Sequence, residues 1–221
     1  MENTITQAKP IEKATKKSAI IYLDCETMPG LTKPDPSEIK VPANYKNEDA
    51  IRKYQEENVE AEYLKQSFCP YQGRLLCVGI AINDDEPFCL TGSEKEILDS
   101  LKEVLTDQIA VEKIVAHNGM TFDFFWLYIK SIKYRIPYLR KTFDGSQRYL
   151  LEDTIKLAQG TKYGELTSAD KLAKLIGVEG KGTITGKDVW PYYQTGRTEE
   201  IYEYCKHDVS MLREIHKRLT E

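Results

Sequence analysis

The stretch AIIYLDCE at residues 19–26 decides the fold, because five apolar residues in a row are followed by two closely spaced carboxylates. A short apolar run of this kind is typical of a buried strand, and Pro29 and Gly30 end it. Successive side chains of a strand alternate between its faces, so Asp24 and Glu26 project from the same face. The sequence therefore predicts a buried strand with a pair of acids at its end, where sheets with helices on both faces carry functional groups.

Two more strands and a helix are predicted further along the chain. The segments 74–83 and 87–90 are apolar and close together in sequence, which predicts a hairpin. Ser93 is followed three residues later by Glu96, and this pattern predicts a capping box at the start of a helix that ends near residue 105.

The second half of the chain alternates between helices and a short strand. We expect a strand at 113–117 and helices at 121–132 and 166–176. Thr198 is predicted to cap a final helix that runs almost to the end of the chain. Strands that come first in hairpins, with helices interleaved later, predict an α/β fold in which helices flank a mixed sheet.

Two regions depart from this pattern. Residues 1–17 are polar, contain several lysines and show no periodicity, which predicts a flexible N-terminal arm. Between about 31 and 73 the chain is first Pro-rich and then highly charged, and 47–66 has the thin apolar stripe of a surface helix. We therefore predict a single domain over 18–221, with a helical insertion after the first strand.

Composition narrows the class of protein. Thirty-one Lys and Arg against 35 Asp and Glu give a net charge of −4, which argues against a passive nucleic-acid coat protein but not against an enzyme that recruits cations locally. No stretch approaches the roughly 18 to 20 apolar residues of a membrane span, and the first residues lack the apolar centre of a signal peptide. The five cysteines are odd in number and lack CxxC spacing, so they suggest neither a disulfide framework nor a structural zinc site. We expect a cytoplasmic protein that makes no membrane contact.

The last helix carries an acid where packing predicts an apolar residue. Asp208 takes one position of the apolar stripe, and a lone carboxylate there requires a salt bridge, backbone donors or a metal ion. Tyr204 lies one turn earlier, so its hydroxyl can share the space in front of Asp208. The stripe comprises Ile201, Cys205, Asp208, Leu212, Ile215 and Leu219.

A further acid, Asp123, lies in the apolar first turn of the helix expected at 121–132. A purely structural role can explain an acid at this position, because a carboxylate stabilises the positive N-terminus of a helix. Three separate elements nevertheless supply four acids, and such a group would repel itself by roughly several kcal/mol unless cations lay between its members. Oxygen ligands, few histidines and the lack of a thiolate cluster favour two Mg²⁺ or Mn²⁺ ions, which about 4 Å apart are suited to phosphoryl transfer.

Three short motifs occur in order along the chain: Asp24-x-Glu26-Thr27, Asn118-x-x-x-Phe122-Asp123 and Tyr204-x-x-x-Asp208. Together they resemble the motifs of the DEDD superfamily of DnaQ-like 3′→5′ exonucleases, and the Tyr four residues before the last Asp resembles the Tyr-type (DEDDy) branch. A wider similarity, to predicted exonucleases related to the proofreading domain of family B DNA polymerases, runs through IVAHNGMTFDFFWL, LAKLIGVEGKG and GKDVWPYYQTGRTEEIYEYCKHDV. The resemblance implies an RNase H-like mixed five-stranded sheet flanked by helices.

The resemblance also implies a mechanism. The protein would be a two-metal-dependent 3′→5′ exonuclease that hydrolyses phosphodiester bonds at the 3′ end of single-stranded DNA and releases nucleoside 5′-monophosphates. Asp24 would bridge both Mg²⁺ or Mn²⁺ ions. Glu26 and Asp208 would complete the ligands of one ion, and Asp123 would hold the other.

Other residues are expected near the substrate. Tyr204, with an ordinary pKa of about 10, would orient the nucleophile by a hydrogen bond rather than act as the base. Thr27 and Phe122 would touch the terminal nucleotide, Phe122 by stacking. Asn118 would lie on the substrate side, although it can also simply form a turn. Lys181, in a glycine-flanked loop, can contact phosphate or be solvated.

Other functions stay open at the level of sequence. An exoribonuclease on the same fold is an alternative, since no residue is identifiable that would read the ribose 2′-hydroxyl. A noncatalytic module that binds nucleic acid or a partner protein is a second alternative, and a structure-specific endonuclease is a third. The expected partners are single-stranded nucleic acid, with DNA favoured, and a replication or repair protein.

Overall fold

The computed structural model describes every residue except 1–17, 108–109, 162–163 and 165–166. The predicted arm and Leu166, at which a helix was expected to start, therefore lie outside the described residues. The strands form one sheet in the order β3-β2-β1-β4-β5, which confirms the mixed five-stranded sheet.

The elements have the following bounds. The strands are β1 (Ser18–Met28), β2 (Arg74–Ile82), β3 (Phe88–Leu90), β4 (Ala110–Ala116) and β5 (Leu151–Asp153). The helices are α1 (Glu48–Lys65), α2 (Glu94–Thr106), α3 (Asp123–Lys133), α4 (Pro137–Phe143), α5 (Thr154–Gln159), α6 (Ala169–Ile176), α7 (Val189–Gln194) and α8 (Thr198–Thr220), with short 3-10 helices η1 (Pro36–Glu38) and η2 (Gln66–Phe68). None of the helices in the described part of the chain is long and apolar enough to cross a membrane.

The two neighbours of the central strand β1 differ in direction and in the length over which they pair with it. It is antiparallel to β2 and parallel to β4. Its pairing with β4 ends at Tyr22, opposite Val115, whereas its pairing with β2 continues to Met28, with a bulge after Glu26. Beyond Tyr22, the edge of β1 that faces β4 is thus open to side chains from helices.

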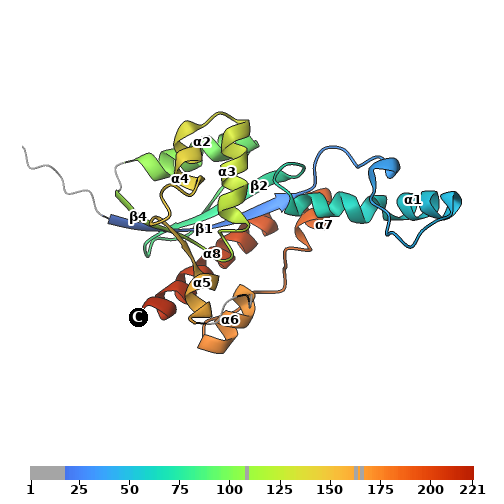
Figure 1. Ribbon diagram of the computed structural model, residues 1–221. Coiled ribbons are helices and arrows are strands. Elements are labelled where there is room, and N and C mark those ends of the chain that lie inside the picture. Colours follow the sequence, from blue (N-terminus) through green and yellow to red (C-terminus); the bar gives the residue numbers. More distant parts are fainter. Residues whose placement is uncertain (1–17, 108–109, 162–163, 165–166) are drawn as a thin grey trace, which may run out of the picture.

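Helices cover both faces of the sheet (Figure 1). Ile21 and Leu23 of β1 pack with residues of α2, α3 and α4 in one apolar cluster. Tyr22, which points to the alternate face, packs with Val209 and Leu212 of α8. Helices α5 and α6 lie on the same side as α8 (Figure 1) and contact it. The even-numbered residues of β1 therefore face α8.

The apolar stripe predicted for the last helix faces the sheet. Cys205 and Ile215 are 0 % exposed, and Asp208 lies between them at 5 % exposed. Gly79 of β2 allows this close approach, because a Cβ there would lie 2.8 Å from Sγ of Cys205 and from Cγ2 of Val209. The helix thus carries its acid into the interior, as the stripe predicted.

The segment between β1 and β2 extends beyond the end of the sheet (Figure 1). The side-chain oxygen of Asn47 caps α1, since it accepts hydrogen bonds from two backbone amides of the first turn at 2.9 and 3.1 Å. Tyr63, a buried residue of α1, donates a hydrogen bond to the carbonyl of Gly30 at 2.9 Å. The surface helix expected at 47–66 is confirmed.

Several boundaries differ from the expected ones. The capping box at Ser93 is present, but Thr198 is not a cap: Arg197 takes the N-cap position of α8 without a side-chain cap bond. The helix expected from residue 121 begins at Asp123, because a turn at Asn118 uses the preceding amides. We did not anticipate β5, α4, α5 and α7, since elements of three to seven residues are too short to show a period.

A buried ion pair joins one helical layer to the sheet. Glu94, the first residue of α2, is 8 % exposed, and its Oε1 accepts from the amide of Leu75 at 2.9 Å and from Nζ of Lys130 at 2.8 Å. Its Oε2 accepts from Nζ of Lys133 at 2.6 Å and from the hydroxyl of Tyr134 at 2.7 Å. Burial alone would raise the pKa of Glu94, but these hydrogen bonds outweigh it and lower the pKa to about 2.

Replacing Glu94 with Gln is expected to lower the free energy of unfolding by about 3 to 5 kcal/mol near neutral pH, because Lys130 becomes an unpaired buried charge. The folded pKa of about 2 lies below the ordinary value of 4.5, so the ionised carboxylate stabilises the fold above about pH 4.5 and this contribution disappears as the pH falls toward 2. Urea unfolding of both proteins across this range measures the difference.

The matched control is Asp99→Asn, which breaks an exposed pair between Asp99 and Lys95 on the same helix. It should stay within about 0.5 kcal/mol of the wild type. A wild-type advantage over Glu94→Gln that did not shrink with acidification would contradict the assignment.

Candidate active site

The two acids of β1 lie against α8. One carboxylate oxygen each of Asp24 and Glu26, and Sγ of Cys205, all lie within 4.8 Å of one another. Glu26 is 7 % exposed. The thiol of Cys205 donates to the main-chain carbonyl of Asp24 at 3.6 Å. The strand and the helix thus bring both acids together on one face, as their spacing predicted.

Asp123 reaches the same strand from the opposite layer. It is the first residue of α3 and is 2 % exposed. Its Oδ1 accepts a hydrogen bond from the amide of Cys25 at 2.9 Å. This donor is available because β4 stops pairing with β1 at Tyr22. Asp123 therefore fills the open edge of β1 next to Asp24, a contact that the helix N-terminus alone does not explain.

Tyr204 and Asp208 lie one turn apart on α8 and share a partner. Nζ of Lys181 donates to the hydroxyl of Tyr204 at 2.8 Å and to Oδ2 of Asp208. Oδ1 of Asp208 is buried and has no hydrogen-bond partner in the described part of the chain. Burial, followed by the charge of Glu26, raises the pKa of Tyr204, so its hydroxyl stays protonated at neutral pH.

Three of the carboxylates, those of Asp24, Glu26 and Asp123, have raised pKa values because of burial and the charge of neighbouring acids. Burial, and next the charge of Asp208, raises the pKa of Asp24 to about 7, although Lys181 opposes this. Burial, and next the charge of Asp24, raises the pKa values of Glu26 and Asp123 well above their ordinary range. The group therefore resists full ionisation unless further positive charge is supplied.

This arrangement fits hard divalent cations. The donors are carboxylate oxygens, one of them an unsatisfied oxygen of Asp208, and Mg²⁺ and Mn²⁺ bind such ligands. Asp24 and Glu26, together with Cys205, form the group whose ligand atoms lie within 4.8 Å of one another, while Asp123 and Asp208 lie outside it. The residues that could hold the ions are Asp24, Glu26, Asp123 and Asp208.

A cavity of about 400 Å³ opens beside the acids. Asp24 and Asp208 line it, and so does Lys181. His117, which also lines it, is bonded at both ring nitrogens, to the hydroxyl of Thr154 at 2.8 Å and to a main-chain carbonyl at 2.9 Å. The cavity gives an outside group access to the carboxylates.

Asn118 both forms a turn and lines this cavity. Its φ is 63°, a left-handed conformation that Asn tolerates. The carboxylate of Asp153, in β5, accepts from the amides of Asn118 and Met120 at 2.9 and 3.1 Å and so fixes the turn. Sequence analysis missed Asp153, because the short strand that carries it shows no pattern.

Thr27 and Phe122 are not among the described residues that line the cavity. The hydroxyl of Thr27 donates to the carbonyl of Ser67 at 2.6 Å, which ties β1 to the end of the insertion. The half-buried ring of Phe122 lies 6.1 Å from that of Trp126. Their contact with a terminal nucleotide stays a prediction.

For Lys181 the sequence left two alternatives open, contact with phosphate or exposure to solvent. Its side chain is 28 % exposed and pairs with Asp208, so it is not merely a solvated loop residue. Asp170 of α6 accepts from the amide of Lys181 at 3.0 Å, and a Cβ at Gly180 would lie 2.6 Å from the same carboxylate oxygen. Gly180, directly before Lys181, was the sequence signal that could have indicated this contact, because the lack of a side chain lets the loop approach Asp170.

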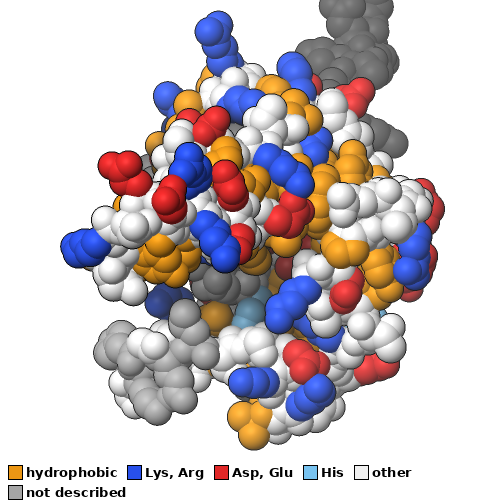
Figure 2. Space-filling view, turned by 90° about the vertical axis from the view of Figure 1, so that its right-hand side faces the viewer, with side chains coloured by type: hydrophobic (Ala, Val, Ile, Leu, Met, Phe, Trp, Pro, Cys, Tyr) orange, Lys and Arg blue, Asp and Glu red, His pale blue; other side chains and the backbone are white. Residues whose placement is uncertain are grey.

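Charges of both signs are interspersed over the face shown in Figure 2. This pattern agrees with a net charge of −4. Attraction for a polyanion would therefore depend on local positive groups such as Lys181 rather than on the overall charge.

The sheet order and the two helical layers define a protein of the RNase H-like fold, as expected. A solved structure of the family B DNA polymerase from the hyperthermophilic archaeon Pyrobaculum calidifontis matches 91% of this chain and 24% of that chain, with a TM-score of 0.61 and 14% identity. At this identity the likeness is one of fold.

The family follows from sequence. The model of predicted 3′-5′ exonucleases related to the exonuclease domain of PolB matches residues 85–212, more than half of the chain, and the chain belongs to that family. The DNA polymerase of Archaeoglobus fulgidus is 23% identical over 151 residues, which are 63% of this chain and 19% of that protein. The chain thus spans about a fifth of the length of this curated relative.

Mn²⁺ is expected to raise the melting temperature of the wild type by about 5 to 10 °C at a hundred times its dissociation constant, because it binds only the folded carboxylate group. Asp24→Asn should lose most of this shift, since Asp24 lies in the group of close ligand atoms. Thermal unfolding with and without Mn²⁺ measures both. Glu214→Gln, an exposed substitution on α8, is the control and should keep the shift. An equal shift in Asp24→Asn would show that Mn²⁺ binds elsewhere.

Proposed function

We propose that the protein is a divalent-metal-dependent 3′→5′ exonuclease that hydrolyses phosphodiester bonds at the 3′ end of single-stranded DNA and releases nucleoside 5′-monophosphates. The observation that carries the proposal is the arrangement of acids around one cavity: Asp24 lies close to Glu26 and lines the cavity together with Asp208 and Lys181. Lys181 in turn donates to both Asp208 and Tyr204. Membership in a family of predicted PolB-related exonucleases supports it.

The proposed metal ligands are the four acids. Asp24 would contact two Mg²⁺ or Mn²⁺ ions, because one of its carboxylate oxygens lies within 4.8 Å of one of Glu26 and Asp123 bonds the amide of the next residue, Cys25. Glu26 and Asp208 would share one ion, and Asp123 would hold the other. When bound, the ions would lower the pKa of the attacking water and stabilise the charge on the leaving oxygen.

Tyr204 and Lys181 would act on the nucleophile and the phosphate. The hydroxyl of Tyr204 stays protonated, so it can donate a hydrogen bond that orients the attacking water, which is the DEDDy role. The ammonium of Lys181 touches Asp208, so it lies where a cation and a phosphate group would both be bound. We propose that Asp208 would help to hold a cation and that the ammonium of Lys181 would neutralise charge on the scissile phosphate.

The substrate end would enter through the 400 Å³ cavity, past Asn118. Phe122 would stack on the terminal nucleotide, a contact that tolerates any base. The hydroxyl of Thr27 already donates to Ser67, so Thr27 would contribute to substrate contact through its main chain. Single-stranded nucleic acid, with DNA favoured, is the proposed partner, and a replication or repair protein is a further one.

The direct test uses a single-stranded DNA oligonucleotide labelled at its 5′ end, with Mg²⁺ or Mn²⁺. The expected product is a ladder that shortens from the 3′ end, and EDTA should abolish it. Asp24→Asn and Asp208→Asn should each lower the rate by about a thousandfold or more, because each removes several kcal/mol of transition-state stabilisation.

Glu214→Gln is again the control, because it removes a negative charge from the same helix as Asp208 at an exposed position. Cleavage that resists EDTA, or that both Asp variants retain, would refute the proposal. Faster degradation of an RNA oligonucleotide of the same sequence would favour the exoribonuclease, and cutting of circular DNA would favour an endonuclease.

Lys181→Ala is expected to lower both the Mn²⁺ concentration needed for half-maximal activity and the maximal rate. Without the competing ammonium, half-maximal activity should need less Mn²⁺, while the maximal rate should fall about a hundredfold because a phosphate partner is lost. Initial rates across an Mn²⁺ titration separate the two effects. Lys187→Ala, an exposed lysine of the same loop, is the control and should match the wild type. A purely structural lysine would leave the Mn²⁺ midpoint unchanged.

A further inference from the structure

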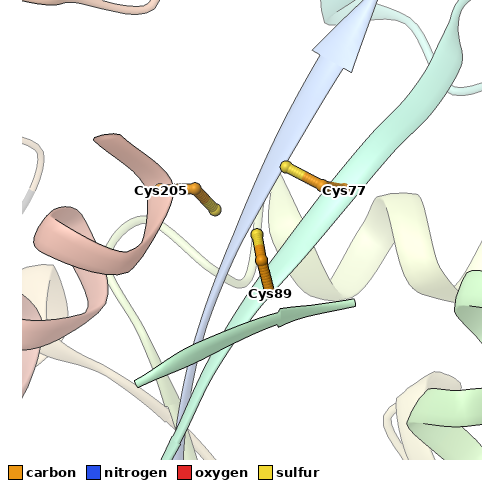
Figure 3. Close-up of side chains that lie close together, drawn as sticks. All are labelled: Cys77, Cys89 and Cys205. Atoms are coloured by element: carbon orange, nitrogen blue, oxygen red, sulfur yellow. The ribbon is translucent and has the colours of Figure 1, made fainter. Parts of the chain in front are cut away.

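Three cysteines that are distant in sequence converge in space (Figure 3). Cys77 of β2, Cys89 of β3 and Cys205 of α8 place their Sγ atoms within 4.8 Å of one another. The sequence expectation of no thiolate cluster was therefore wrong. It rested on the lack of CxxC spacing, whereas here the thiols come from three separate elements.

The sheet register explains the convergence. Cys77 and Gly79 are two residues apart on β2, so they point to the same face. Cys89 pairs with Gly79 across the β2–β3 ladder and shares that face. Because Gly79 has no side chain, Cys205 can approach: a Cβ there would lie 2.8 Å from its Sγ. The glycine thus leaves the space in which the three sulfur atoms meet.

We propose that Cys77, Cys89 and Cys205 form a binding site for a thiophilic d¹⁰ cation of the Zn²⁺ class. Three thiolates on one tetrahedral ion lie about 3.8 Å apart at a Zn–S distance of about 2.3 Å, and the observed spacing is within 4.8 Å. Cys77 and Cys205 are buried, whereas Cys89 on the edge strand is partly exposed. The exposed side provides the entry path and a fourth position for water.

This site differs from the carboxylate site in ligand chemistry, and it does not depend on the proposed nuclease function. Sulfur ligands select soft and borderline ions, whereas carboxylates select Mg²⁺ and Mn²⁺. Cys205 belongs to both groups, since its Sγ also lies within 4.8 Å of carboxylate oxygens of Asp24 and Glu26. The experiment therefore has to distinguish a site of three thiolates from a mixed site.

The test is a Co²⁺ titration of the full chain, reduced with a phosphine, freed of metal and kept in excess Mg²⁺ to fill the carboxylates. We expect one equivalent to bind, with a near-ultraviolet thiolate-to-cobalt charge-transfer band and the visible bands of a tetrahedral ion, and Zn²⁺ should displace it. Cys89→Ser should weaken binding at least about a hundredfold. Cys69→Ser, which changes a cysteine outside the cluster, should leave it unchanged.

The wild-type spectrum alone decides whether thiolates bind the ion, and the serine variants then decide which cysteines supply them. A wild-type protein without a charge-transfer band would overturn the proposal. A band that survives in both Cys77→Ser and Cys89→Ser, but disappears in Cys205→Ser, would also overturn it, because the ion would then lie on Asp24, Glu26 and Cys205.

Discussion

The buried carboxylates at the end of β1 are the constraint on which the rest of the structure depends. Burial and mutual repulsion raise the pKa values of Asp24, Glu26 and Asp123. Acids in such a place cost free energy unless hydrogen bonds or cations compensate them. The donors that the described residues offer these acids include the amide of Cys25 and the ammonium of Lys181. A site so arranged is suited to holding further positive charge.

The sheet makes this gathering possible through two local irregularities. Because β4 stops pairing at Tyr22, the amide of Cys25 is free for Asp123, and the α3 layer can reach β1. Because β2 has glycine at position 79, α8 packs close against the sheet from the other layer. The strand is thus approached by acids from both sides, which neither helical layer could achieve alone.

The positive charge of the site is local rather than spread over the surface. Lys181 comes from a loop that Asp170 ties down, and the face shown in Figure 2 mixes both signs. A protein with a net charge of −4 can thus still present a cation beside its acids. The similar polymerases are much longer chains, and what the solved structure shares with this chain is the fold.

The sequence by itself determined the elements with strong periodicity and the acids that break it. The stripe of the last helix placed Asp208 in the interior, and alternation along β1 placed Asp24 and Glu26 on one face, because both follow from fixed backbone periods. Only the tertiary structure decided the partner of Lys181 and the meeting of the three cysteines. These contacts join segments that are far apart in sequence, so no helical or strand period relates them. They depend on where a strand stops pairing and on where a glycine lets a neighbouring helix approach the sheet.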